Sequence, residues 1–367
     1  MRMIASFLLM AVTGSAWVTA AEAPSAKSVT VLDLHRGSLR AFLAWRTSSL
    51  VSADGTLKLM LEAKGRNMKE EDRRPLPVHQ SAGPAGNWAS AEFDDTDWPR
   101  MRGAAAVRSN KGWDRVWIRG AFMVSDPAKV RGLKLDLTYV GGVIVSVNSV
   151  ELTRAHLPKG ELKPRTFAER YPDEAYVRPD GKLYGRRDGA KFADRMKLRV
   201  RRLAGGGIAI PSKMLRQGMN VVAVQSVGAP IAEVASTAPQ ADTRWVLPLW
   251  PHAGILQARL ESAAGSGLVP NVGPTPGVSI GNVSPVETVF AWDHALSSEK
   301  LRPVRLIGAK NGAFSGRVML SSSQKIQGLK ASATDLDLQG QPGKIPAAAV
   351  QIRWADAARS GQTWVPV

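Results

Sequence analysis

The sequence predicts an all-β fold, and three features of the chain indicate it. Gly and Pro are frequent, with 34 and 23 among 367 residues, and they separate short segments instead of leaving room for long helices. Several of these segments alternate apolar and polar residues as half-buried strands do, most clearly 115–124, 133–137 and 219–225. Because 44% of residues are hydrophobic and 22% charged, the chain can bury a sizeable core.

Residues 1–23 read as a secretory signal peptide. Arg2 supplies a positive charge, residues 4–12 form a short apolar stretch, and small residues follow around Ala20. The apolar stretch is shorter than the roughly 20 residues that a transmembrane helix needs, and no later stretch comes close to that length. We therefore expect export to the periplasm or the outside of the cell, with no transmembrane segment after the signal is cleaved.

The strand pattern predicts two units. A jelly-roll sandwich is expected over residues 29–262, interrupted at 151–205 by a polar, basic insertion that contains Pro and Gly. Residues 263–282 are rich in Gly and Pro, which is typical of a linker. A second, smaller β-sandwich is expected over residues 283–367.

The chain lacks the residues of several classes of catalytic site. It has no cysteine, which excludes disulfide frameworks, zinc–thiolate sites and cysteine nucleophiles. The five histidines stand far apart, and no phosphate-binding loop, dinucleotide fingerprint or serine-nucleophile motif occurs. We therefore do not expect this chain to be an enzyme by itself.

The net charge of +18 is the strongest compositional deviation, and it is uneven. Residues 154–202 hold 15 Lys and Arg against 7 Asp and Glu. Such a region attracts sulfated or uronate polysaccharide, anionic lipid or nucleic acid. Because export separates the chain from nucleic acid, polysaccharide is the favoured partner, and a solvated basic surface without a ligand is the alternative.

Two groups of residues are candidates for contacting carbohydrate. In the first, Trp113 offers an apolar face to a sugar ring, while Asp114 and Arg115 offer hydrogen bonds to its hydroxyl groups. The second lies in the insertion, where arginine can bond a sulfate or carboxylate at two points. Its members are Tyr171, Tyr176, Tyr184, Arg186 and Arg187. The simpler interpretations are a loop anchored by Trp113 and a solvated insertion.

A turn rich in aspartate lies between Phe93 and Trp98. Its carboxylates belong to Asp94, Asp95 and Asp97. They could bind calcium, which prefers oxygen ligands, or they could cap the turn by bonding nearby backbone amides. We favour capping, with calcium as the alternative and no other cofactor.

Four segments resemble, in order and spacing, the galactose-binding-like jelly roll that precedes the catalytic barrel in glycoside hydrolase family 2. They are FDDTDW at 93–98, VWIRGAFMV at 116–124, VSVNSVEL at 145–152 and LRQGMNVVAV at 215–224. The resemblance implies a sugar-binding or scaffolding module. Residues 143–148 predict a strand that ends in a hairpin turn at Asn148 and Ser149. Ser149 replaces the hairpin Gly of that family, and both this residue and the basic insertion depart from the family's pattern.

Residues 283–367 are similar, more weakly, to the N-terminal β-sandwich of family 123-like hydrolases. The likeness rests on AKNG at 309–312 and on the segment from Ile345 to Arg353. In that family the barrel with the catalytic carboxylates follows this sandwich. The resemblance therefore implies that residues 283–367 are the start of a truncated hydrolase region.

Together these features predict an exported, non-catalytic carbohydrate-recognition or substrate-positioning portion of a glycoside-hydrolase-like protein. One alternative is a structural or interaction protein of the envelope that uses the insertion as a docking surface. Another is an O-glycosyl hydrolase whose catalytic carboxylates lie within these residues. The sequence specifies neither the sugar nor the oligomeric state.

Overall fold

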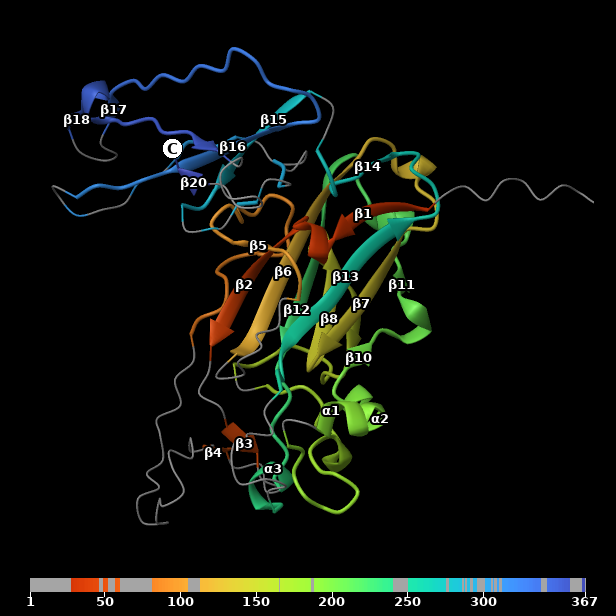
Figure 1. The fold of residues 1–367 in the computed structure, drawn as a ribbon. Coiled ribbons are helices and arrows are strands. Elements are labelled where there is room, and N and C mark those ends of the chain that lie inside the picture. The colour runs from red at the N-terminus through yellow and green to blue at the C-terminus, as the bar shows by residue number, and fades with distance from the viewer. Residues whose placement is uncertain are drawn as a thin grey trace, which may run out of the picture.

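A computed structural model gives the fold (Figure 1). It describes residues 28–45, 49–51, 57–59, 81–104, 113–164, 166–185, 188–239, 250–274, 277–285, 287, 289–290, 293–295, 301–304, 306, 309, 312–337, 342–356 and 365–366. The predicted signal peptide lies outside these residues.

Residues 28–274 contain two antiparallel sheets that share one core, and we call this part the sandwich (Figure 1). The smaller sheet has the order β1 (Val29–Asp33), β13 (Gly254–Ser262), β7 (Lys134–Val140) and β10 (Arg201–Arg202), with β11 (Ile208–Ala209) also paired to β7. The larger sheet has the order β5 (Arg100–Met101), β2 (Leu39–Trp45), β6 (Trp113–Val124), β12 (Gly218–Val227), β8 (Gly142–Val147) and β9 (Val150–Ala155), with β14 (Leu268–Val269) also paired to β6.

Strand β6 shows why this sequence forms a sandwich. Val116, Ile118 and Phe122 are fully buried in the core between the sheets, as the two-residue period of a strand requires. Trp117 and Arg119 point to the opposite face of the sheet and are buried there by other parts of the chain. The predicted strand over 115–124 is confirmed, and it is buried on both faces.

The segment 81–104 covers the outer face of the larger sheet. Trp98 packs there on Phe42, with ring centroids 5.4 Å apart, and Phe42 packs on Trp117 at 5.8 Å. Two buried cations of this face meet one carboxylate, because Asp95 lies 2.7 Å from Arg119 Nε and 3.8 Å from Arg40 Nε. The aspartate-rich turn therefore neutralises charges that the sheet places on its outer face.

The predicted hairpin turn at Asn148 and Ser149 is confirmed. It joins the antiparallel strands β8 and β9, and both residues have positive φ, 50° and 72°. The Asn148 side chain donates to Asn220 Oδ1 at 2.8 Å and accepts from the Val221 amide at 3.0 Å, which ties the turn to β12.

The predicted insertion contains little regular structure. Its helical turns are η4 (Asp173–Ala175), α1 (Asp188–Lys191), α2 (Ala193–Lys197) and η5 (Ala204–Gly206). Short helical turns elsewhere in the described chain are η1 (Leu34–Arg36), η3 (Pro127–Lys129), η6 (Ser212–Met214), α3 (Val234–Thr237) and η7 (Ala347–Ala349). A short strand pair, β3 (Ser49–Val51) and β4 (Leu57–Leu59), lies apart from the two sheets. In the part of the chain that the structure describes, no helix is long and apolar enough to cross a membrane.

Residues 263–282, predicted as a linker, are partly held on the sandwich. Strand β14 pairs with β6, the Asn271 amide donates to the Val31 carbonyl at 2.8 Å, and Asn271 Nδ2 donates to the Ala121 carbonyl at 2.8 Å. The boundary between the two predicted units stays a prediction.

We call residues 277–366 the C-terminal segment. It consists of two-stranded antiparallel pairs, namely β15 (Val278–Val283) with β16 (Arg317–Ser322), β17 (Leu336–Asp337) with β18 (Lys344–Ile345), and β19 (Ala355–Asp356) with β20 (Val365–Pro366). Its buried apolar cluster contains Val283, Val289, Ala295 and Met319. Every strand pairing described in the chain is antiparallel, so the predicted all-β class is confirmed.

Candidate functional site

The insertion packs at one end of the sandwich, which we call the loop end. Val227, at the end of β12, pairs there with Arg115 of β6 and with Gly142 of β8, while Gly254 of β13 pairs with Val140 of β7. Figure 1 shows α1, α2 and α3 gathered beyond these strand ends. The described members of both predicted carbohydrate-contacting groups belong to this end.

Asp114 and Arg115 are buried at the start of β6 and anchor the insertion. The Arg115 guanidinium donates to the carbonyl oxygens of Lys163 at 2.8 Å and Pro164 at 3.1 Å. The two side chains also form an ion pair, with Arg115 Nε 3.6 Å from Asp114 Oδ2. Trp113 is the first residue of β6, and its side chain lies outside the described residues. The role of these three residues in carbohydrate binding stays a prediction.

The three tyrosines of the insertion are buried, with 1% of Tyr171, 0% of Tyr176 and 6% of Tyr184 exposed. Tyr176 lies 4.4 Å from Trp250, and Trp250 stacks on His252 at 4.7 Å, measured between ring centroids. We call Tyr171, Tyr176, Trp250 and His252 the aromatic cluster. In this structure neighbouring side chains enclose the tyrosine rings, which do not line an open surface, so their predicted contact with a glycan stays untested. Arg186 and Arg187 lie outside the described residues.

Two arginines hold the insertion against this cluster. The Arg199 guanidinium lies over Trp250 at 4.1 Å and over Tyr184 at 5.2 Å, and its Nε donates to the Ala175 carbonyl at 2.9 Å. Arg201 lies over Tyr171 at 4.1 Å and donates to the carbonyls of Gly141 and Glu169, both at 2.9 Å. Cation–π stacking and hydrogen bonds to carbonyl oxygens together offset the hydration energy that these guanidinium groups lose on burial.

Two tyrosine–histidine pairs at the loop end are uncharged near neutral pH. Burial lowers the pKa of His252 to about 4, and its Nε2 lies 3.0 Å from the Tyr176 hydroxyl. Burial also raises the pKa of Tyr139 to about 12 and lowers that of His156, whose Nδ1 lies 2.9 Å from the Tyr139 hydroxyl. Both pairs therefore act as neutral hydrogen bonds that hold the loops.

Sequence reasoning missed Trp250, His252, Arg199 and Arg201. Trp250 and His252 come just before β13, a position that places them at the same end as the insertion. The structure thus places the tyrosines of the insertion around residues that the sequence did not single out.

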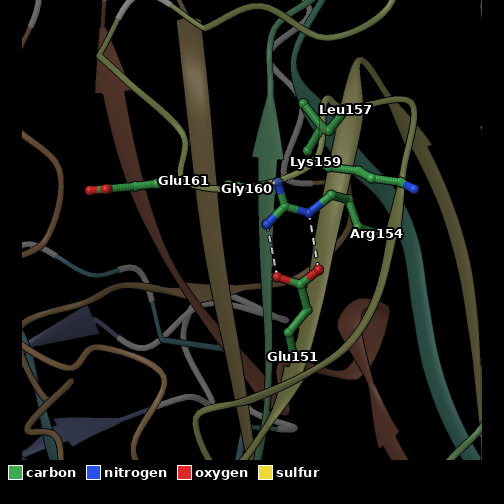
Figure 2. A pocket seen from close by; sticks show the side chains of 6 residues that line it. All are labelled: Glu151, Arg154, Leu157, Lys159, Gly160 and Glu161. Carbon is green, nitrogen blue, oxygen red and sulfur yellow. Dashed lines mark hydrogen bonds and ion pairs between the residues drawn. The ribbon is translucent and has the colours of Figure 1, made fainter.

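An open hollow of about 690 Å³ lies along β9, beside the loop that leads from this strand into the loop end (Figure 2). Its lining residues are Glu151, Arg154, Leu157, Lys159, Gly160 and Glu161. Arg154 is bonded at two points to Glu151, with distances of 3.0 and 2.8 Å, and this contact lowers the pKa of the Glu151 carboxyl. Arg154 also donates to the carbonyls of Pro158 and Gly160 at 2.6 Å each, which fixes the loop that forms the rim.

The rim of the hollow contains apolar, cationic and anionic side chains. Leu157 packs against the buried apolar side chains of the loop end, so the hollow is backed by the buried part of that end. Lys159 and Glu161 are exposed and point to opposite sides in Figure 2. The site therefore offers an apolar wall, a cationic donor and a carboxylate acceptor to a polar molecule.

The aspartates of the turn make contacts expected of turn capping. Asp94 accepts from the amide and hydroxyl of Thr96, at 3.1 and 2.7 Å, and pairs with Arg302. Asp95 binds the two arginines of the sheet. Among the described residues, no three His, Cys, Asp or Glu side chains group closely enough to hold a metal ion. Calcium at Asp94, Asp95 and Asp97 stays a prediction, and this geometry favours capping.

No protein-family model and no curated protein matches the chain. Among solved structures it is distantly similar to parts of glycoside hydrolases. A β-glucosidase from Kluyveromyces marxianus matches over 58% of this chain and 19% of its own, at 9% identity and a TM-score of 0.20. A β-glucuronidase from an uncultured Clostridium sp. matches over 70% and 32%, at 10% identity and 0.19. A family 2 glycosyl hydrolase from Bacteroides cellulosilyticus matches over 61% and 20%, at 10% identity and 0.18. The chain thus spans between about a fifth and a third of these proteins.

Proposed function

We propose that the loop end binds a glycan without catalysing a reaction, as the carbohydrate-recognition or substrate-positioning portion of an exported glycoside-hydrolase-like protein. The observation that carries the proposal is the hollow of about 690 Å³ on the basic insertion. Its volume lies within the range of roughly 300–1,000 Å³ that small-molecule sites occupy, and its lining offers both apolar and polar contacts.

The rim is already held in place, which supports binding. Arg154 fixes the loop around Gly160, and Arg115 fixes the following residues through the carbonyls of Lys163 and Pro164. Because these segments are ordered by contacts with the sandwich, a ligand would not have to order them on binding.

The charges of the insertion favour an anionic glycan. Its guanidinium groups are largely occupied by backbone carbonyls, whereas Lys159, Lys163 and Lys182 are exposed and form no ion pair within the described residues. Lysine offers a mobile point charge where arginine would offer a planar two-point contact. We therefore expect attraction that weakens with salt and distinguishes poorly between sulfate and carboxylate.

The carboxyl groups at the hollow support binding over catalysis. Glu151 is held by Arg154, and this pairing lowers its pKa, whereas a general acid in glycoside hydrolysis needs a raised pKa. Turnover of chromogenic glycosides by the purified chain would establish the alternative of a hydrolase and contradict this proposal.

Binding of residues 24–367 to an array of neutral, sulfated and uronate glycans, at low and physiological salt, tests the proposal. We expect sulfated and uronate glycans to bind in preference to neutral ones, and the double variant Lys159→Ala, Glu161→Ala to bind them about tenfold more weakly. Lys213→Ala is the matched control, because Lys213 is exposed in η6 near the opposite end of the sandwich. Equal binding by the double variant and the wild type would place the site elsewhere, and no binding at low salt would refute it.

A second candidate function, an interaction protein, is favoured by the exposed apolar side chains of the C-terminal segment. Val278 is 60% exposed, Leu301 50% and Trp354 46%. Exposed apolar surface of this kind marks sites of protein association. Capture of a specific protein partner, together with no glycan binding, would favour this function over the first.

A further inference from the structure

A group of charged side chains joins the sandwich to the C-terminal segment. Arg102, which follows β5, has its Nε 2.7 Å from Asp293 Oδ1 and its guanidinium 3.2 Å from Glu287 Oε1. Only 16% of the Arg102 side chain, 5% of Asp293 and 4% of Glu287 is exposed, so this contact is largely removed from water. The Phe290 ring lies 5.5 Å from the same guanidinium.

Further contacts cross the same junction. Arg100 of β5 donates to the His294 carbonyl, and Arg302 pairs with Asp94 of the aspartate-rich turn. Within the segment, Arg317 of β16 donates to the carbonyls of Ser284 and Glu287. Both sides of the junction therefore contribute cations and acceptors.

We infer that Arg102, Glu287 and Asp293 form a charge clamp that docks the strand pair β15–β16 on the sandwich, so that these two parts form a single body. In the chain, Arg102 lies 185 residues before Glu287 and 191 residues before Asp293. The clamp thus fixes the orientation of the segment that follows the sandwich.

The clamp acts through the peptide that carries its carboxylates. Residues 287–295 supply Glu287 and Asp293, and they also supply Val289 and Ala295, half of the buried cluster of the segment. The Ala295 amide donates to Ser321 Oγ of β16 at 2.9 Å. A continuous path of contacts therefore runs from Arg102 through this peptide to β16.

The strand pair needs this support. Two antiparallel strands alone are at best marginally stable in water, and the buried cluster beneath β15 and β16 has four side chains in the part of the segment that the structure describes. Loss of Arg102 would remove the cation that lies 2.7 Å from Asp293 and 3.2 Å from Glu287, and separation of the segment from the sandwich would return these buried carboxylates to water. Undocking is therefore the expected response to removal of the charge.

Hydrogen–deuterium exchange of the full chain tests the clamp. In Arg102→Met we expect the amides of β15 and β16 to exchange at least tenfold faster, while those of β6 and β12 keep their wild-type rates. The matched control is Arg216→Met, which removes an exposed pair with Glu92, with 47% and 68% of the two side chains exposed. It should leave both regions unchanged, because exposed pairs contribute little.

A second variant is needed if Arg102→Met speeds amide exchange throughout the chain and not only in β15 and β16. Glu287→Gln with Asp293→Asn changes only the C-terminal segment and should speed exchange in β15 and β16. Added to Arg102→Met, it should cause little further change, because all three substitutions break one contact. Wild-type exchange of β15 and β16 in both variants, or fully additive effects, would overturn the inference.

Discussion

The sandwich and the C-terminal segment bury their apolar side chains in different ways. In the sandwich, Phe122, Leu137 and Ile255 come from both sheets and are fully buried in one continuous core. Among its described residues, the segment buries a cluster of four side chains and leaves residues such as Val278 and Trp354 half exposed. Stability therefore resides in the sandwich, and the segment depends on what it docks against.

The insertion and the C-terminal segment both contain little regular structure, but side chains hold the insertion in place. Its arginines donate to backbone carbonyls and stack on aromatic rings, as Arg199 and Arg201 do. Those contacts replace the hydrogen bonds that a sheet or helix would supply. An irregular region can thus be a firm part of the structure when side chains satisfy its backbone.

The largest expected effect tests whether stability resides in the sandwich. Phe122→Ala should lower its free energy of unfolding by about 4 kcal/mol, because a large side chain leaves the core and a cavity remains. Met319→Ala, made in the cluster of the segment, should leave the unfolding of the sandwich unchanged. Urea unfolding followed by tryptophan fluorescence measures both, and equal losses would remove the distinction between the regions.

The next effect concerns the outer face of the sandwich. Asp95→Ala should cost about 3 kcal/mol, because Arg40 and Arg119 lose the carboxylate between them. Asp97→Ala, at an exposed position of the same turn, should change stability by less than about 0.5 kcal/mol. Neither calcium nor a chelator should shift thermal unfolding; a calcium-dependent rise in Tm that Asp97→Ala abolishes would instead support a calcium site.

The loop end should make the stability of the sandwich depend on pH. The unfolded His252 ring binds a proton near pH 6.5, whereas the folded ring does so only near pH 4. Between these values the unfolded state holds more protons, so stability falls as pH falls. The full shift corresponds to about 3 kcal/mol, and we expect about 2 because His252 as a whole residue is only half-buried.

Unfolding of wild type and His252→Gln between pH 7 and pH 4 measures this effect. The variant should lose about 2 kcal/mol of the pH dependence, whereas His35→Gln, at an exposed histidine outside the loop end, should keep it. The same pH dependence in His252→Gln and wild type would show that the aromatic cluster does not hold a neutral histidine.

The smallest expected effect is an increase in the stability of the sandwich. Ser149 has a φ of 72°, a conformation that costs a side chain roughly 1 kcal/mol and glycine almost nothing. Ser149→Gly loses an exposed hydrogen bond to Asn87, so we expect a net stabilisation of about 0.5 kcal/mol in thermal unfolding. Ser212→Gly, in the helical turn η6, should give no gain. A loss at Ser149 would mean that its side-chain contact outweighs the backbone cost.

Much of the fold was determined by the sequence. Alternating residues predicted β6, and Asn148 with Ser149 predicted the hairpin between β8 and β9. Both signals are local, because the two-residue period of a strand and the φ preference of a turn act over a few neighbouring residues. The aspartate-rich turn was likewise predictable from its own residues.

Only the tertiary structure decided what surrounds the chemically interesting side chains. The tyrosines of the insertion were predicted as candidate ligand contacts, but Arg199 of the same insertion and Trp250 from a later part of the chain enclose them. The partners of Arg102 lie far away in sequence. Burial and charge pairing depend on which loops contact one another. The entropic cost of closing a loop grows only slowly with its length, so sequence separation does not indicate which distant residues will meet. Local patterns therefore fix the strands, whereas the packing of distant segments fixes the site.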